Sequence, residues 1–161
     1  MKKSQQLNFS IMLFLSIALM LCSIFQFYIS FMIVLTILII KNLISIFCFK
    51  NKSETYSLFT NLIITLTYLV LNFTGEILCL PFCLLLWIIA ESFKKIPELD
   101  EIYPKSSKIW LIKITNFFIL LTLGFLSSIS LFYFPIHEML ILGFYFFVIG
   151  IFSLNEYLIE S

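Results

Sequence analysis

The sequence has few charged residues and little of what catalysis or phosphate recognition usually needs. It contains ten lysines but no arginine, nine acidic residues, one histidine and four glycines in 161 residues. The absence of arginine removes the forked donor that suits phosphate groups, and a net charge of +1 gives no excess to attract nucleic acid. We therefore expect neither nucleic-acid binding nor a bound cofactor.

Apolar residues are abundant instead. They make up 61% of the chain and charged residues only 12%, against roughly 45–50% and about 25% in an ordinary soluble domain. A soluble domain would not place so much apolar surface against water. This composition predicts a protein that lies in the lipid bilayer.

The first apolar run is too long for one membrane crossing. No charged residue occurs from Ser4 to Ile40. A single helix over this run would be about 55 Å long, against roughly 30 Å of hydrocarbon, so the chain must turn back once. Gln26 and the aromatic residues beside it indicate the place, since amphipathic rings favour the membrane interface. We predict helices near 8–25 and 28–48.

Four further helices are predicted near 56–75, 77–93, 109–134 and 139–155. Charged residues, glycine or proline bound these apolar runs. The expected fold is all-α, a polytopic integral membrane protein with about six transmembrane helices arranged as three hairpins in a single domain over 1–161. The fourth helix is short and contains Pro81, so a re-entrant segment is the alternative there.

The lysines determine the expected orientation, because short loops rich in positive charge stay on the cytoplasmic side. With six spans, all ten lysines lie at or toward one end of the helices, and the other end keeps only Glu76, His137 and Glu138. Both termini and a charged loop over 94–108 are therefore expected in the cytoplasm. The expected membrane is the bacterial cytoplasmic (inner) membrane.

Polar residues form a stripe along the third predicted helix. Ser57 is followed, at spacings of four, four, three, four and four residues, by Asn61, Thr65, Tyr68, Asn72 and Glu76. At 100° per residue these side chains lie within an arc of about 100°, so they face protein or water. The stripe predicts either hydrogen bonds between helices, which we favour, or a hydrophilic path. It also predicts that this helix is central in the bundle.

The charged residues Lys41 and Glu91 lie within predicted helices. Lys41 is in the second helix, and Glu91 lies near the cytoplasmic end of the fourth, so both belong to the same leaflet. A lysine side chain can extend toward the interface, which brings its ammonium group toward the level of Glu91. We expect an intramembrane ion pair, with a lysine that reaches the headgroups alone as the alternative.

Cys79 and Cys83 are four residues apart and could form a thiol pair, with Cys22 in the same leaflet. The spacing differs from the Cys-x-x-Cys of redox motifs, and a free cysteine is often a small buried hydrophobe. His137 and Glu138 begin a His-Glu-x-x-His zinc motif that lacks its second histidine. We therefore expect no metal site and a structural role for the thiols.

Small residues recur at helical spacings in the last third of the chain. Gly124 and Ser128 are four residues apart, and Gly143 and Gly150 are seven apart. Such positions let helices approach closely. They predict packing seams, either within the bundle or between subunits.

No motif assigns an activity, so function is expected only at the level of protein class. We expect a non-enzymatic membrane protein that acts through helix contacts, as an accessory subunit of a membrane complex or an immunity-type protein against a pore-forming toxin. The expected partners are the lipid bilayer and another membrane protein or a second copy of the chain. The alternatives are a small transporter or channel subunit with its path along the third helix, and a thiol-redox membrane enzyme.

Overall fold

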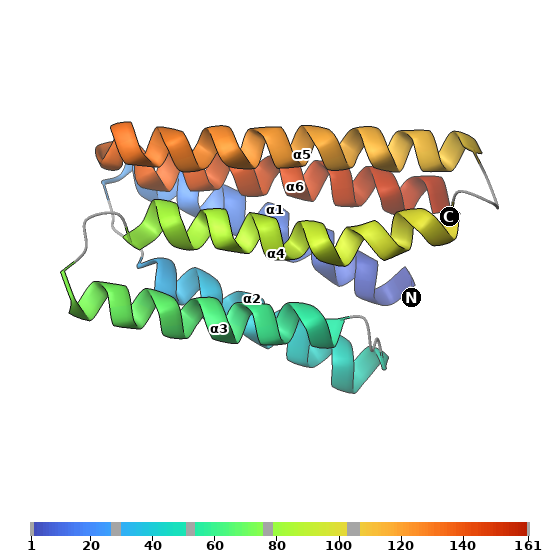
Figure 1. Cartoon of the computed structure of the whole chain (residues 1–161), viewed down its shortest axis with the longest axis horizontal. Coiled ribbons are helices and arrows are strands. Elements are labelled where there is room, and N and C mark those ends of the chain that lie inside the picture. The colour runs from blue at the N-terminus through green and yellow to red at the C-terminus, as the bar shows by residue number, and fades with distance from the viewer. Residues whose placement is uncertain (1, 27–29, 51–53, 76–78, 103–106, 161) are drawn as a thin grey trace.

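The computed structural model describes residues 2–26, 30–50, 54–75, 79–102 and 107–160 (Figure 1). These residues form α1 (Lys2–Ile24), α2 (Phe31–Phe49), α3 (Glu54–Phe73), α4 (Cys79–Ile102), α5 (Ser107–Tyr133), η1 (Pro135–His137) and α6 (Glu138–Glu160). Among them, α1, α2, α3, α5 and α6 are long and apolar enough to cross a membrane. The prediction of an all-α fold with several membrane-crossing helices is confirmed.

The first hairpin turns where the sequence predicts it. α1 ends at Ile24, and Gln26 takes a left-handed backbone conformation with a φ of 58°, which reverses the chain. Ser30 then caps α2, because its hydroxyl accepts the backbone N–H of Met32 at 3.3 Å. The predicted break between the helices near 109–134 and 139–155 is also confirmed, and the 3₁₀ helix η1 fills it.

The fourth helix is longer than predicted. The expected helix over 77–93 and loop over 94–108 are replaced by one helix that continues through the lysines to Ile102, and α5 already begins at Ser107. Pro81 lies in the first turn of α4, where its missing N–H is not needed. The lysine, glutamate and leucine residues around Pro97 have high helix propensity, which explains why α4 continues. Residues 103–106 lie outside the described residues.

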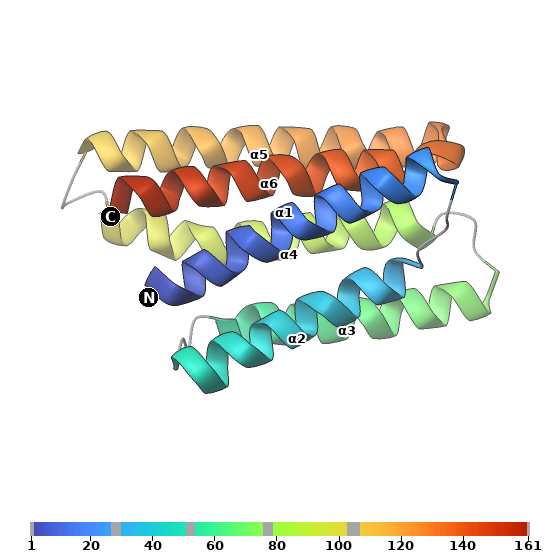
Figure 2. The same ribbon diagram turned by 180° about the vertical axis from the view of Figure 1, so that it is seen from behind.

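The helices run up and down side by side (Figures 1 and 2). α1 packs most extensively against α6, α4 packs against α5, and the α2–α3 pair lies at one edge. The prediction that the third helix is central is wrong, because α3 contacts mainly α2 and α4. Its other face carries the exposed side chains of Phe59, Ile63 and Leu66.

The small residues of α5 and α6 form seams within the bundle. A Cβ atom at Gly143 would lie 3.2 Å from the Ser16 carbonyl oxygen of α1, and one at Gly150 would lie 2.8 Å from the Leu13 side chain. Gly124 is equally crowded by Ile88 and Tyr145. These glycines therefore bring α1 close to α6, and α5 close to α4 and α6.

Both termini lie at the same end of the bundle, on the right in Figure 1. The start of α1, the end of α2, the second half of α4 and the start of α5 also lie at this end. Described lysines cluster here, namely Lys3, Lys50, Lys94, Lys95 and Lys108. We call this the lysine-rich end.

Candidate functional site

A cavity of about 620 Å³ lies in the half of the bundle nearer the lysine-rich end, and all six α-helices contribute to its wall. Small-ligand sites commonly have about 300–1,000 Å³. Seven of the lining residues are lysines or glutamates: Lys41, Glu54, Glu91, Lys94, Lys95, Lys113 and Glu156. Ionisable residues among membrane helices are costly, so they indicate a functional site by default.

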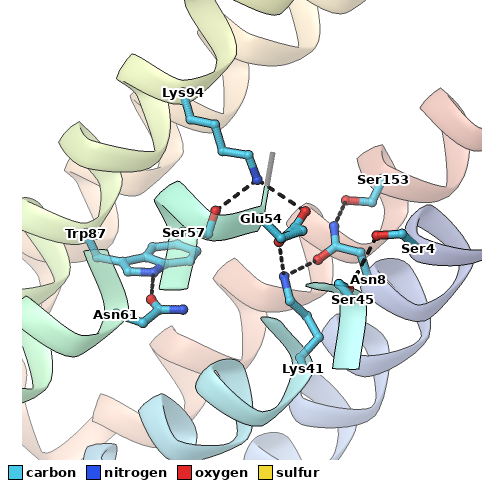
Figure 3. Close-up of polar contacts among 10 residues, drawn as sticks. All are labelled: Ser4, Asn8, Lys41, Ser45, Glu54, Ser57, Asn61, Trp87, Lys94 and Ser153. Atoms are coloured by element: carbon cyan, nitrogen blue, oxygen red, sulfur yellow. Dashed lines mark hydrogen bonds and ion pairs between the residues drawn. The ribbon is translucent and has the colours of Figure 1, made fainter. Parts of the chain in front are cut away.

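Glu54 is the centre of the charged cluster (Figure 3). One carboxylate oxygen lies 3.4 Å from the Lys41 Nζ on α2, and the other lies 3.3 Å from the Lys94 Nζ on α4. All three side chains are at most 16% exposed. Two ammonium groups therefore share one carboxylate, which leaves this triad with a net charge of +1.

Neutral partners orient the two ammonium groups. Lys41 donates to the Asn8 Oδ1 at 2.9 Å, and Lys94 donates to the Ser57 hydroxyl at 2.8 Å. Both bonds are shorter than the contacts to Glu54, although a charge-assisted bond usually measures about 2.7–2.9 Å. The ion pairs are therefore loose, and Asn8 and Ser57 hold the lysines in place.

Further hydrogen bonds join helices at the same level of the bundle (Figure 3). Asn8 donates to Ser153 on α6 at 3.3 Å, and Ser4 donates to Ser45 on α2 at 3.3 Å. α1 is thus linked to both α2 and α6 beside the cavity.

Trp87 lines the inner part of the cavity. Its indole N–H donates to the Asn61 Oδ1 at 2.9 Å, and its ring packs edge-on against Tyr145, with 6.4 Å between the ring centroids. Trp87, Asn61 and Tyr145 all line the cavity and are buried. The aromatic contacts fix the indole, so that the wall keeps its shape.

A separate ion pair, the Glu91 carboxylate and Lys113 form the rest of the charged cavity wall. Lys95 lies 3.3 Å from Glu156, and these side chains are 32% and 20% exposed. Glu91, half-buried on α4, lines the same cavity but forms no ion pair within the described part of the chain. It lies within Coulombic range of Lys41 and Tyr145.

The polar stripe of the third helix faces inward only in part. Asn61 and Tyr68 are buried and Thr65 is half-buried, with its hydroxyl bonded to the Asn61 carbonyl at 2.7 Å. Asn72 is exposed in the last turn of α3, so its amide does not need a protein partner, contrary to expectation. Glu76 lies outside the described residues. Of the stripe residues from Asn61 to Asn72, only Asn61 lines the cavity, so no continuous path along α3 is formed.

The expected ion pair between Lys41 and Glu91 is not formed. Lys41 pairs with Glu54 instead. Glu54 begins α3, directly after the short connection from α2, so the hairpin brings its carboxylate to the lysine. The extended helix α4 places Lys94 on the same carboxylate.

Cys79 and Cys83 are both buried free thiols near the start of α4, at the end of the bundle opposite the lysine-rich end. The two side chains interact with each other, and the Cys79 thiol also donates to the Tyr68 carbonyl oxygen at 3.5 Å. Neither cysteine lines the cavity. In the described ranges, no group of three or more His, Cys, Asp or Glu side chains could hold a metal ion.

Sequence reasoning missed most of the charged wall. Lys94 was expected in the loop over 94–108, and Glu54 in the connection between the helices predicted near 28–48 and 56–75. A periodic signal was present, because Glu54 lies three residues before Ser57 and falls on the same helical arc as the stripe. Trp87, Glu91 and Lys94 likewise share one face, at spacings of four and three.

The chain matches no protein-family model, no curated protein and no solved structure. The geometry of the charged cavity is therefore the basis for the function proposed below.

Proposed function

We propose that this protein is a small transporter or channel subunit that holds a small polar solute in the cavity between its six helices. The observation that supports this proposal is a cavity of about 620 Å³ with seven lysine and glutamate side chains in its wall. Transporters commonly place their solute site deep between helices, where buried polar groups replace the water that the solute loses. Asn61 and Trp87 provide such groups at the inner end of the cavity.

The other expected function, action through helix contacts with a partner protein, has less support. The small residues that could form an intermolecular seam are used within the bundle, because Gly143 and Gly150 contact α1 and Gly124 contacts α4 and α6. That function stays a prediction without a specific surface to carry it.

Passage of the solute across the membrane requires the helices to move. Beyond Trp87 the bundle interior is filled by apolar core residues, among them Leu35, Leu84, Leu142 and Phe146. The α2–α3 pair contacts the other four helices less extensively than α1 contacts α6. In the proposed cycle, this pair therefore shifts against the other four helices to expose the cavity to the opposite side.

Solute uptake by proteoliposomes tests the proposal. The purified full chain would be reconstituted and given labelled amino acids, sugars, carboxylates and amines, with protein-free liposomes as background. We expect uptake of at least one class above background, reduced by the Trp87→Ala substitution at the cavity wall. Background uptake of every class would overturn the proposal.

We further propose that the protein lies in the bacterial cytoplasmic membrane with the lysine-rich end in the cytoplasm. Short lysine-rich segments of membrane proteins are retained on the cytoplasmic side. Single cysteines at Ser107 and His137, both exposed and at opposite ends of α5 and its following turn, report the two sides. In a chain without its native cysteines, an impermeant thiol reagent added to intact cells should label His137→Cys and not Ser107→Cys. The reverse pattern would show the opposite orientation.

A further inference from the structure

Glu91 differs from the other two carboxylates of the cavity wall. Glu54 and Glu156 each have a lysine ammonium group within 3.4 Å, which stabilises the charged form of the carboxylate. Glu91 forms no ion pair and no side-chain hydrogen bond in the ranges that the structure describes. It is half-buried and lines the cavity, so water in the cavity can bring a proton to it. Glu91 is therefore the wall carboxylate that can most easily change its charge.

Every helix except α1 brings a charged or titratable group toward Glu91. These are Lys94 and Lys95 on α4 itself, Lys41 on α2, Glu54 on α3, Lys113 on α5, and Tyr145 and Glu156 on α6. The lining residues of α1 are neutral. The four lysines and three glutamates of the wall give a formal sum of +1. A proton on Glu91 raises this sum by one unit.

The Lys41 ammonium group has a donor for a solute carboxylate. A lysine ammonium has three N–H donors. In the described part of the chain, those of Lys41 have two partners, the Asn8 Oδ1 at 2.9 Å and the Glu54 carboxylate at 3.4 Å (Figure 3). The third donor belongs to a side chain that lines the cavity. A carboxylate in the cavity can therefore accept this hydrogen bond while both protein contacts remain.

A carboxylate bound at Lys41 and the charge of Glu91 affect each other. Glu91 lies within Coulombic range of Lys41, so a solute carboxylate at Lys41 also lies near Glu91. Two negative carboxylates repel each other in a poorly solvated site, and a proton on one of them removes the repulsion. The solute and the proton therefore favour each other's binding, by the same factor in both directions.

Joint binding also limits the electrostatic cost of filling the site. One carboxylate and one proton together add no net charge to the cavity wall, whereas either of them alone changes its charge by one unit. An added net charge in a poorly solvated site is unfavourable. This difference holds for any arrangement of charges outside the cavity.

We propose that the cavity binds a small monocarboxylate at Lys41 together with a proton at Glu91. The juxtaposition of the third Lys41 donor and the Glu91 carboxylate on one cavity carries the proposal, which rests on the transporter function proposed above. In the transport cycle, Glu91 takes its proton from water on one side of the membrane and returns it to water on the other. The carboxylate crosses in the same step, so no net charge is moved.

Binding of pyruvate at different pH values tests the coupling. Pyruvate is a small monocarboxylate, and its affinity for the full chain in detergent would be measured by isothermal titration calorimetry between about pH 5 and pH 7. The affinity should fall by about threefold to tenfold per pH unit as the pH rises, where tenfold is the limit for one proton taken up with each pyruvate. An affinity that does not change with pH, or an absence of binding, would overturn the proposal.

Pyruvamide, the neutral amide of similar size, tests the solute class in the same experiment. It should bind about tenfold or more weakly than pyruvate, because it loses the charge-assisted contact to Lys41. Its affinity should not depend on pH, since it does not repel Glu91. Equal binding of the two compounds would contradict the carboxylate site at Lys41.

Proton uptake during binding can be measured directly. In buffers with different ionisation enthalpies, the measured heat changes with every proton that the buffer gives up, and the unaltered chain should take up as much as about one proton per pyruvate. Glu91→Gln imitates the protonated side chain, so it should bind pyruvate without proton uptake and without the pH dependence. If Glu91→Gln fails to fold, proton uptake by the unaltered chain still decides whether binding is coupled to a proton.

Two control variants should keep the pH dependence. Glu156→Gln is the same chemical change at a carboxylate that is paired with Lys95. His137→Gln removes the side-chain type that usually titrates near neutral pH, and His137 lies exposed at the opposite end of the bundle. A pH dependence that survives Glu91→Gln, or that is lost in either control, would show that the proton binds elsewhere.

Proteoliposomes separate failure of this inference from failure of the proposed function. Buffer that is more acidic outside than inside should raise pyruvate uptake by the protein above that in protein-free liposomes, and the absence of this rise would contradict the coupling. If other solutes are taken up and pyruvate does not bind, the solute class is wrong and the transporter function stands. If pyruvate binds with proton uptake and no solute is taken up, the transporter function is wrong and the joint site stands. If pyruvate does not bind and no solute is taken up, both are wrong.

Discussion

Replacing Glu54 by glutamine should lower the stability of the folded bundle by about 3–5 kcal/mol, the cost typical of removing one partner from a buried ion pair. The glutamine keeps the shape of the side chain but removes its charge. Lys41, which is 5% exposed, and Lys94 then lose their shared counter-ion while they remain inside the bundle. Thermal unfolding of the purified chain in one detergent measures the loss.

Glu156→Gln is the matched control for this change. Its ion pair with Lys95 has the same length, 3.3 Å, as the contact between Glu54 and Lys94, but it is more exposed and involves a single lysine. An ion pair that water can reach contributes only about 1 kcal/mol or less. Equal losses for the two variants would contradict the central role of Glu54.

The pairing can be tested with the double variant Lys41→Met and Glu54→Gln. Since the two residues are in contact, the combined loss should be smaller than the sum of the single losses. The same test with Lys41→Met and Glu91→Gln should show weaker coupling, because these residues form no ion pair. A stronger coupling to Glu91 would restore the pairing first expected from the sequence.

The helices were largely predictable because a helix that crosses a membrane needs a long run of apolar residues. Every apolar run of sufficient length became a helix. The length of the hydrocarbon required a turn in the first run, and Gln26 with its aromatic neighbours indicated the place. This requirement does not predict whether a charged segment is helical. α4 therefore continued through Lys94 and Lys95 to Ile102, where hydropathy and Pro97 predicted a loop.

The candidate site was less predictable because it depends on which helices are neighbours. Lys41 could reach carboxylates on several helices at the same level, and only the packing of α2 beside α3 selects Glu54. The stripe on α3 correctly indicated an inward face at Ser57 and Asn61. It could not indicate that the cavity ends near Asn61 and leaves the rest of the stripe to packing.

The seam between α1 and α6 should also be sensitive to substitution, in this case to added volume. Gly143→Val is expected to destabilise the bundle by at least about 1–3 kcal/mol, the typical cost of overpacking. A Cβ atom at this position would lie 3.2 Å from the Ser16 carbonyl oxygen and 3.2 Å from the Met20 backbone nitrogen. Backbone atoms cannot turn aside as a side chain can, so α1 and α6 must separate along their most extensive contact.

Two variants distinguish this crowding from other effects of valine. Phe144→Val places the same β-branched residue at the next position, where the native side chain is 52% exposed, and should cost less. Met20→Ala removes the Met20 side chain, whose Cγ would lie 3.0 Å from the new Cβ, but leaves both backbone contacts. Added to Gly143→Val, it should therefore restore only part of the thermal stability in detergent. Full restoration would show that the Met20 side chain, and not the close approach of the two backbones, sets the limit at this seam.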